Sequence, residues 1–251
     1  FQDDLTDTSL IREYISDQSD YESLIRLYEE KEKGQPLFLF NVTMQNHSGY
    51  DKPWHGLERT AELTGVLAGR FPTVDQYLSL IKQSDNAFQS LIDYFSQVEE
   101  PTMILLFGDH QPQVATSFYT KMLGGSEDTW DAATAQKRQA VPFVIWANYD
   151  IPEQSGVILS PNYLGVLTAQ TAGLPLTGYM NFLAQMYQEL PVITPVGLIT
   201  ADGQTLTESE LNEEQQEWLW KYETFNYCGM IDLFDEARPF FCPPQDREQY
   251  R

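Results

Sequence analysis

The chain has 251 residues, 42% of them hydrophobic, which is enough for one large domain or two small ones with a sizeable core. It carries 37 acidic and 15 basic residues, and the formal net charge of −22 argues against non-specific binding to nucleic acid or to an anionic membrane surface. An anionic substrate is still compatible with this charge, because a bound metal ion reverses the field locally. No run of 18 apolar residues is present, so we expect no transmembrane helix, and we see no signal peptide.

The first part of the chain contains a predicted helix and a predicted strand. Residues 1–33 are acidic and helix-prone, with Ser19 as the expected N-cap. Leu37–Met44 is nearly all apolar, as is typical of a strand that is buried on both faces. A polar cluster with Asn46 and His47 follows at once. A lone loop histidine is most often a surface residue, so His47 becomes a candidate only if the pattern recurs.

The middle of the chain is predicted to hold a long helix. It follows a loop whose histidine, His55, we expect at the surface. Thr73–Gln76 forms a capping box, and apolar residues then recur at helical spacing until about Glu99. Asp85 lies on the flank of this apolar stripe, where a carboxylate needs a partner. We expect Asp85 to form a structural hydrogen bond to a nearby loop rather than to act in catalysis.

The pattern recurs in the next apolar run, Thr102–Phe107, which again predicts a buried strand. Gly108 follows and allows a sharp turn, and Asp109 and His110 come directly after it. Open α/β sheets bind ligands at the carboxyl ends of their strands, and a carboxylate beside an imidazole suits a divalent metal. The alternative reading of the tripeptide alone is an aspartate that caps a helix, next to a surface histidine.

Two predicted strands therefore each deliver a histidine just past the carboxyl end. The strand–helix–strand unit has the right length for a right-handed parallel crossover. If the two strands are parallel neighbours, His47 and His110 converge on one crevice.

The remainder of the chain is predicted to alternate polar connections with short elements. We interpret the long connection 111–139 as a functional loop. The further predicted elements are a strand at 141–147, helices at 161–172 and 181–190, a hairpin at 196–207 with Asp202-Gly203 as its turn, and a helix after the capping box 207–210. We predict a catalytic part at 1–190 and a small hairpin-and-helix extension at 191–251. Cys228 and Cys242 are compatible either with a disulfide or with two free thiols.

Several of these segments, in this order, resemble the lipoteichoic acid synthase family of sulfatase-like phosphoglycerol transferases, within the alkaline phosphatase superfamily. The resemblance is carried by Phe38–Tyr50, Tyr77–Asp85, Phe107–Pro112, Ser160–Ile193 and Trp220–Asp235. It implies an α/β fold, with a mostly parallel sheet flanked by helices and a small carboxyl-terminal α+β subdomain.

The resemblance also implies a mechanism. In that family a threonine attacks the phosphodiester of phosphatidylglycerol, a divalent metal (commonly manganese) polarises it, and an acceptor hydroxyl then takes the glycerophosphoryl group. Asp109 and His110 match two of the metal ligands, with zinc or magnesium as the other candidate ions. His47 matches the histidine that contacts the substrate phosphate, so it is the candidate catalytic residue, with Asn46 beside it as a substrate-binding residue.

The family's two other metal ligands, a glutamate and the nucleophilic threonine, have no matching segment in residues 1–33. We therefore expect a carboxyl-terminal half of the catalytic domain, inactive alone and weak in metal binding. The resemblance implies an intact protein on the extracytoplasmic face of the cell membrane, anchored through a missing amino-terminal part. It would move phosphoglycerol or phosphoethanolamine from a phospholipid to a cell-envelope glycopolymer, as in lipoteichoic acid synthesis. The alternatives are a sulfatase or phosphodiesterase of the same superfamily, or a non-catalytic binding module.

Overall fold

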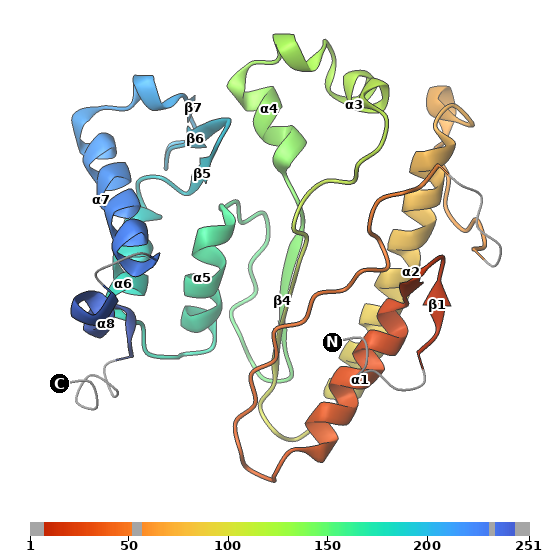
Figure 1. The fold of residues 1–251 in the computed structure, drawn as a ribbon, viewed down its shortest axis with the longest axis horizontal. Helices are drawn as coiled ribbons and strands as arrows, with labels where there is room; N and C mark the ends of the chain where they lie inside the picture. Colours follow the sequence, from red (N-terminus) through yellow and green to blue (C-terminus); the bar gives the residue numbers. More distant parts are fainter. Residues whose placement is uncertain (1–7, 52–56, 231–233, 244–251) are drawn as a thin grey trace. The chain divides into compact units, whose positions relative to one another are not determined.

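The computed structural model describes residues 8–51, 57–230 and 234–243, and His55 lies outside them. The chain divides into two compact units (Figure 1). Unit 1 comprises Phe1–Thr102 and His110–Gly124, and unit 2 comprises Met103–Asp109 and Gly125–Arg251. The expected division at residue 190 stays a prediction. Within the described ranges, no helix is both long and apolar enough to cross a membrane.

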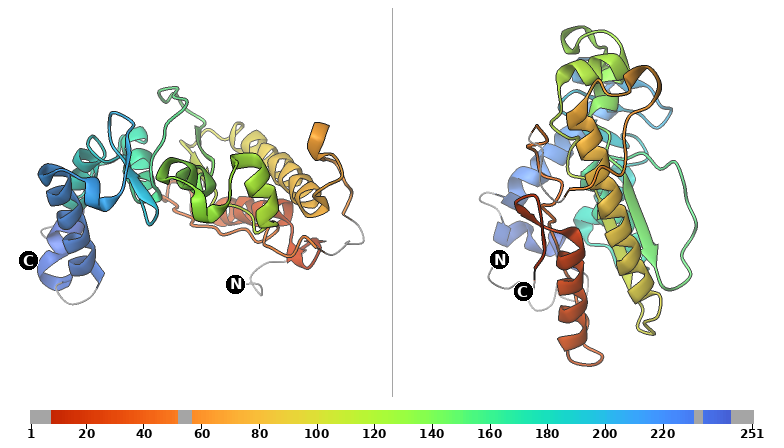
Figure 2. Two further views of the ribbon diagram at one scale, coloured as in Figure 1. Left: turned by 90° about the horizontal axis from the view of Figure 1, so that it is seen from above. Right: turned by 90° about the vertical axis from the view of Figure 1, so that its right-hand side faces the viewer.

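Unit 1 is built on two helices that lie side by side (Figures 1 and 2). Its elements are β1 (Leu10–Ile11), β2 (Tyr14–Ile15), α1 (Asp17–Glu30), η2 (Gly65–Leu67), α2 (Pro72–Phe95) and α3 (Thr116–Leu123). The apolar stripe predicted for the long helix supplies Leu91 and Phe95, which are buried, whereas Ile81 of the same stripe is exposed. Leu80 and Ala87, which lie outside the predicted stripe, complete the buried face. The N-cap of α1 is Ser16, three residues before the expected cap Ser19, because the Ser16 side chain accepts a hydrogen bond from the backbone N–H of Ser19.

The segment Leu37–Met44 is not a strand, and this prediction is wrong. Its backbone is irregular and pairs with no strand among the described residues (Figure 1). The side chains of Phe38, Phe40 and Val42 are 87%, 70% and 60% exposed. The apolar pattern predicts burial on two faces, but a strand also needs neighbours to bond its N–H and C=O groups, and the described residues supply none.

Unit 2 contains the predicted strand that precedes the Gly-Asp-His tripeptide. The first elements of this unit are β3 (Met103–Phe107), η3 (Glu127–Thr129), α4 (Ala132–Gln139) and β4 (Phe143–Ala147). A Cβ atom on Gly108 would lie 3.1 Å from the Cβ of Val141, so the turn after β3 has little room for a side chain. The connection 111–139, expected to be an irregular loop, instead forms α3, η3 and α4.

The α/β class is confirmed, but the expected parallel pairing is not seen. Strands β3 and β4 pair antiparallel, with Met103 opposite Ala147 and Phe107 opposite Phe143, and every other strand pair among the described residues is also antiparallel. An apolar run predicts a strand without giving its direction, which depends on where the following connection returns the chain. The sheets themselves are small, with two or three strands each.

The rest of unit 2 packs around one apolar core. Its elements are η4 (Pro161–Tyr163), α5 (Leu164–Thr171), α6 (Gly178–Met186), β5 (Val192–Thr194), β6 (Gly197–Ile199), β7 (Thr205–Leu206), η5 (Glu208–Glu210), α7 (Glu213–Met230) and α8 (Phe234–Phe241). The Tyr163 hydroxyl donates to the Leu190 carbonyl oxygen at 2.8 Å inside this core. The hairpin prediction is confirmed, with Gly203 in the left-handed region at its turn. Cys228 and Cys242 are free thiols.

Candidate functional site

The loop 45–50 carries Asn46 and His47, and buried polar contacts fix its inner side. The Gln45 side chain is buried, accepts from the Asp17 N–H at 2.9 Å and donates to the Ser84 hydroxyl at 3.0 Å. The Asn46 amide also donates to the Ser84 hydroxyl, at 2.7 Å. The loop is thus tied both to the first turn of α1 and to the middle of α2, in the core of unit 1.

Arg12, in the turn between β1 and β2, holds the outer side of the same loop. Its guanidinium donates to three backbone carbonyl oxygens: Gln45 at 2.8 Å, His47 at 2.6 Å and Gly49 at 3.1 Å. It also lies over the rings of Tyr14 and Tyr50, at 5.2 and 5.4 Å from their centroids. Partial burial lowers the pKa of Arg12 from its usual value, and the three carbonyl acceptors compensate part of that desolvation.

The His47 imidazole is exposed, and one of its nitrogens has a defined partner. The Tyr14 hydroxyl oxygen lies 3.1 Å from Nδ1, and the two rings are tilted at 5.5 Å between centroids. The neighbouring Asn46 amide oxygen is buried and accepts no hydrogen bond within the described part of the chain. A buried acceptor without a donor is costly, so Asn46 Oδ1 is suited to receive a donor group from a ligand.

Asp17 gives this region its unusual electrostatics. It is buried and accepts from the Ser84 hydroxyl, while its other oxygen has no hydrogen bond among the described residues. Burial, together with the nearby charge of Asp20, raises the pKa of Asp17 to about 6. The carboxylate that ties α1 to α2 therefore takes up a proton at a mildly acidic pH.

The sequence did not predict the residues that hold the loop, and it predicted a loop contact for Asp85 that the adjacent Ser84 makes. Arg12, Tyr14 and Asp17 lie in an acidic segment without a local motif, and they contact a loop about thirty residues away. Asp85 was expected to bond a loop, but it is exposed, and Ser84 makes that contact instead. The only usable signal was the spacing of the α2 stripe, on which Ser84 faces the core.

Asp109 and His110 follow β3 as predicted, and both are exposed. The boundary between the two units falls between them, so that Asp109 belongs to unit 2 and His110 to unit 1. His110 Nδ1 lies 2.9 Å from the Gln111 carbonyl oxygen. Because a carbonyl only accepts, Nδ1 carries the proton and Nε2 carries the lone pair, as in a metal-ligating histidine. No group of three or more His, Cys, Asp or Glu side chains suited to a metal occurs in the described ranges.

Unit 1 brings the two histidine-bearing segments into one compact body. Tyr50, at the end of the His47 loop, is within electrostatic range of Tyr119, and burial raises its pKa to about 12. The Tyr119 hydroxyl in turn donates to the Pro112 carbonyl oxygen at 2.6 Å, two residues after His110. The ligand and substrate roles of Asn46, His47, Asp109 and His110 stay predictions.

Three comparisons place this chain among known proteins. Residues 2–174 match the family model described as Sulfatase. The chain is 28% identical, over 78% of its length, to a protein of Rhizobium meliloti (strain 1021) named as a cyclic beta-1,2-glucan modification protein. It is 30% identical, over 39% of its length, to the capsular polysaccharide biosynthesis protein RkpI of the same organism. These matches cover 31% and 16% of those two proteins.

Among solved structures, the chain is similar to the Streptococcus pyogenes phosphoglycerol transferase GacH in complex with sn-glycerol-1-phosphate. The TM-score is 0.62 at 12% sequence identity, and the match covers 95% of this chain and 56% of that one. At this identity the likeness concerns the fold. The chain thus spans about half of that transferase and less than a third of the longer relatives.

Proposed function

Because the chain belongs to the sulfatase family, we propose that it is part of an extracytoplasmic, metal-dependent transferase that moves a phosphoglycerol group from a phospholipid to a cell-envelope glycan. The observation that carries the proposal is the loop 45–50, where an exposed imidazole is held on a backbone that is fixed from both sides. Catalysis of phosphoryl transfer depends mainly on positioning and electrostatics, and such a loop supplies positioning.

His47 and Asn46 are the proposed substrate contacts. The exposed imidazole of His47 is suited to donate a hydrogen bond to a phosphoryl oxygen or to protonate a leaving group. The buried Asn46 amide oxygen is suited to accept from a hydroxyl of the glycerol. The glycan acceptor is suggested by the relative named for cyclic beta-1,2-glucan modification, and phosphoethanolamine remains a second candidate group.

Asp109 and His110 are the proposed metal ligands. Both side chains are exposed, and His110 carries its proton on Nδ1, which donates to the Gln111 carbonyl oxygen, the tautomer that metal-ligating histidines often have. A carboxylate and an imidazole together fit manganese, zinc or magnesium to different degrees. When bound, such an ion would neutralise negative charge on the phosphoryl oxygens. Two ligands give weak binding, so the remaining ligands would come from elsewhere in the full-length protein.

We propose that this chain alone is inactive. The sequence offers no counterpart to the family's nucleophilic threonine, and the chain spans 56% of the solved transferase that it resembles. The exposed apolar row at Leu37–Met44 supports the same view, because such rows are normally covered by another part of a protein. Membrane anchoring of the intact protein is part of this proposal.

The test uses the full-length gene product with fluorescent phosphatidylglycerol and a β-1,2-glucan oligosaccharide. We expect manganese-dependent transfer to the glycan, reduced at least a hundredfold in His47→Ala and Asp109→Ala, and unchanged in Lys33→Ala, a control on an exposed residue of unit 1. Release of glycerol phosphate to water without transfer would favour the sulfatase or phosphodiesterase alternative. Absence of both reactions in the full-length protein would favour a non-catalytic binding module.

A further inference from the structure

We propose that the β1–β2 hairpin is a positioning element for His47, in which Arg12 fixes the loop backbone and Tyr14 fixes which ring nitrogen carries the proton. His47 then presents Nε2–H as a hydrogen-bond donor to an anionic oxygen. The functional meaning of this arrangement rests on the proposed role of His47 in phosphate binding. Its test, however, needs no turnover.

The turn between the two strands holds the backbone of Arg12 in a left-handed conformation, which is strained for a residue with a side chain. Ile11 pairs with Tyr14, so Arg12 and Glu13 form a two-residue turn. Arg12 has φ 59° and is the one non-glycine residue with positive φ in the described ranges. The first position of such hairpin turns usually holds glycine, since a side chain there is strained. Strain of this kind persists where the side chain makes contacts that the protein needs.

The Arg12 contacts are of a kind that only a guanidinium makes. Its acceptors are the carbonyl oxygens of residues 45, 47 and 49, so alternate residues of the loop all turn a carbonyl toward one group. A planar guanidinium offers five N–H donors in a fixed fork, whereas an ammonium group offers three from a single point. The Tyr14 and Tyr50 rings flank the cation, and the Tyr50 hydroxyl closes the loop with a 2.6 Å bond to the Asn46 carbonyl oxygen.

Tyr14 acts on the ring itself. Its hydroxyl lies 3.1 Å from His47 Nδ1, and either group can be the donor in this contact. We assign the donor role to the Tyr14 hydroxyl, so that Nδ1 is the acceptor. In a neutral imidazole the other nitrogen then carries the proton. Nε2 forms no hydrogen bond with the described residues, and the ring is exposed, so this N–H is available to a ligand. A donor of this kind suits a phosphoryl oxygen.

His110 holds its proton on the other ring nitrogen. His110 donates from Nδ1 to the Gln111 carbonyl oxygen, which leaves a lone pair on Nε2. With the Tyr14 hydroxyl as donor, the two histidines have opposite tautomers, each set by a neighbour: the proton is on Nδ1 in His110 and on Nε2 in His47.

The experiment is long-range ¹⁵N–¹H NMR of the imidazoles in this chain, which contains only three histidines. Signals are assigned with His47→Gln, His55→Gln and His110→Gln, at a pH where all three are neutral. We expect a protonated Nε2 in His47 and a protonated Nδ1 in His110. Protonation of His47 at Nδ1 in the wild-type chain would overturn the proposal, whatever the outcome of the activity assay.

Three variants separate positioning from folding. Tyr14→Phe should convert His47 to a mixture of tautomers and leave the His110 signals unchanged. Arg12→Lys should broaden the His47 signals, because the loop loses at least one of its three carbonyl contacts. Tyr28→Phe is the matched control, since it also removes a bonded tyrosine hydroxyl from unit 1 but lies outside the loop. An unchanged His47 tautomer in folded Tyr14→Phe would refute the role of Tyr14.

Discussion

The Ser84 hydroxyl donates to Asp17 Oδ2 at 2.5 Å and so joins the middle of α2 to the first turn of α1. The same hydroxyl accepts from the side chains of Gln45 and Asn46. One small polar group therefore connects both helices to the candidate site. Asp17 is only 1% exposed, and its second oxygen has no hydrogen bond among the described residues, so its ionised form is poorly stabilised.

The first prediction concerns pH. Because burial raises the pKa of Asp17 from 3.8 to about 6, the folded state binds a proton more tightly than the unfolded state. The free energy of unfolding should therefore be highest below about pH 4 and fall as the pH rises through 6, by up to about 3 kcal/mol from this residue. Asp17→Asn should flatten that slope, as measured by urea unfolding at pH 4.5 and 7.5.

Asp20 also contributes to the pH dependence, and Asp85 provides the control. Burial also raises the pKa of Asp20, so some of the slope should remain in Asp17→Asn. Asp85→Asn is the matched control, because this aspartate is exposed on α2 beside Ser84 and should leave the slope as in the wild type. If Asp17→Asn and the wild type lose stability equally between the two pH values, Asp17 is not the group that titrates.

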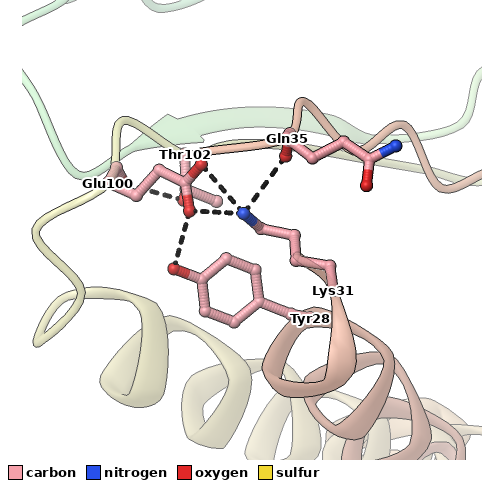
Figure 3. A network of polar contacts seen from close by, with 5 residues as sticks. All are labelled: Tyr28, Lys31, Gln35, Glu100 and Thr102. Atoms are coloured by element: carbon pink, nitrogen blue, oxygen red, sulfur yellow. Dashed lines mark hydrogen bonds and ion pairs between the residues drawn. The ribbon is translucent and has the colours of Figure 1, made fainter. Parts of the chain in front are cut away.

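The second prediction concerns the end of α1, where Lys31 bonds to Glu100 at 2.8 Å (Figure 3). The lysine side chain is only 11% exposed, also donates to the Gln35 carbonyl oxygen, and lies over the Tyr28 ring. Lys31→Met should lower the Tm of the chain by a few degrees, because a partly buried network loses its cation. The exposed pair of Lys221 and Glu217 is the comparison, and Lys221→Met should change the Tm much less.

The third prediction concerns the exposed apolar row at Leu37–Met44. Phe38→Ser and Phe40→Ser should reduce binding of a hydrophobic dye and self-association of the chain without loss of stability, because both rings are mostly exposed. Leu80→Ala, at a fully buried position of α2, should by contrast cost about 2–5 kcal/mol. A large loss of stability in either phenylalanine variant would mean that the row is covered in solution by the chain itself.

Local sequence patterns predicted most helices and turns correctly, but they did not predict how the strands pair. The long helix that ends at Phe95 and the turn at Gly203 were predicted because helical periodicity and turn chemistry act over a few residues. The direction of β4 against β3 depends on a connection whose path no local pattern encodes. Leu37–Met44 was predicted to be a strand because its apolar composition indicates burial. Composition alone does not say whether a neighbouring strand or another part of the protein covers the segment.

The candidate site divides in the same way. Asn46, His47, Asp109 and His110 could be selected as candidates because they lie within three residues of the end of an apolar run. The residues that hold the first loop could not be predicted, because a contact from Arg12 to residue 47 spans the whole of α1. Sequence patterns thus select candidate groups, whereas the groups that orient them depend on tertiary packing.

The last prediction concerns the metal. Mn²⁺ added to this chain should broaden the NMR signals of His110 through its paramagnetism, at concentrations well above those that saturate a four-ligand site. Asp109→Ala should remove most of this broadening, because the lone pair on His110 Nε2 would then be the only proposed ligand left. Asp128→Ala, an exposed aspartate in the same long connection, is the control. Equal broadening in Asp109→Ala and the wild type would contradict a metal role for Asp109, independently of any activity.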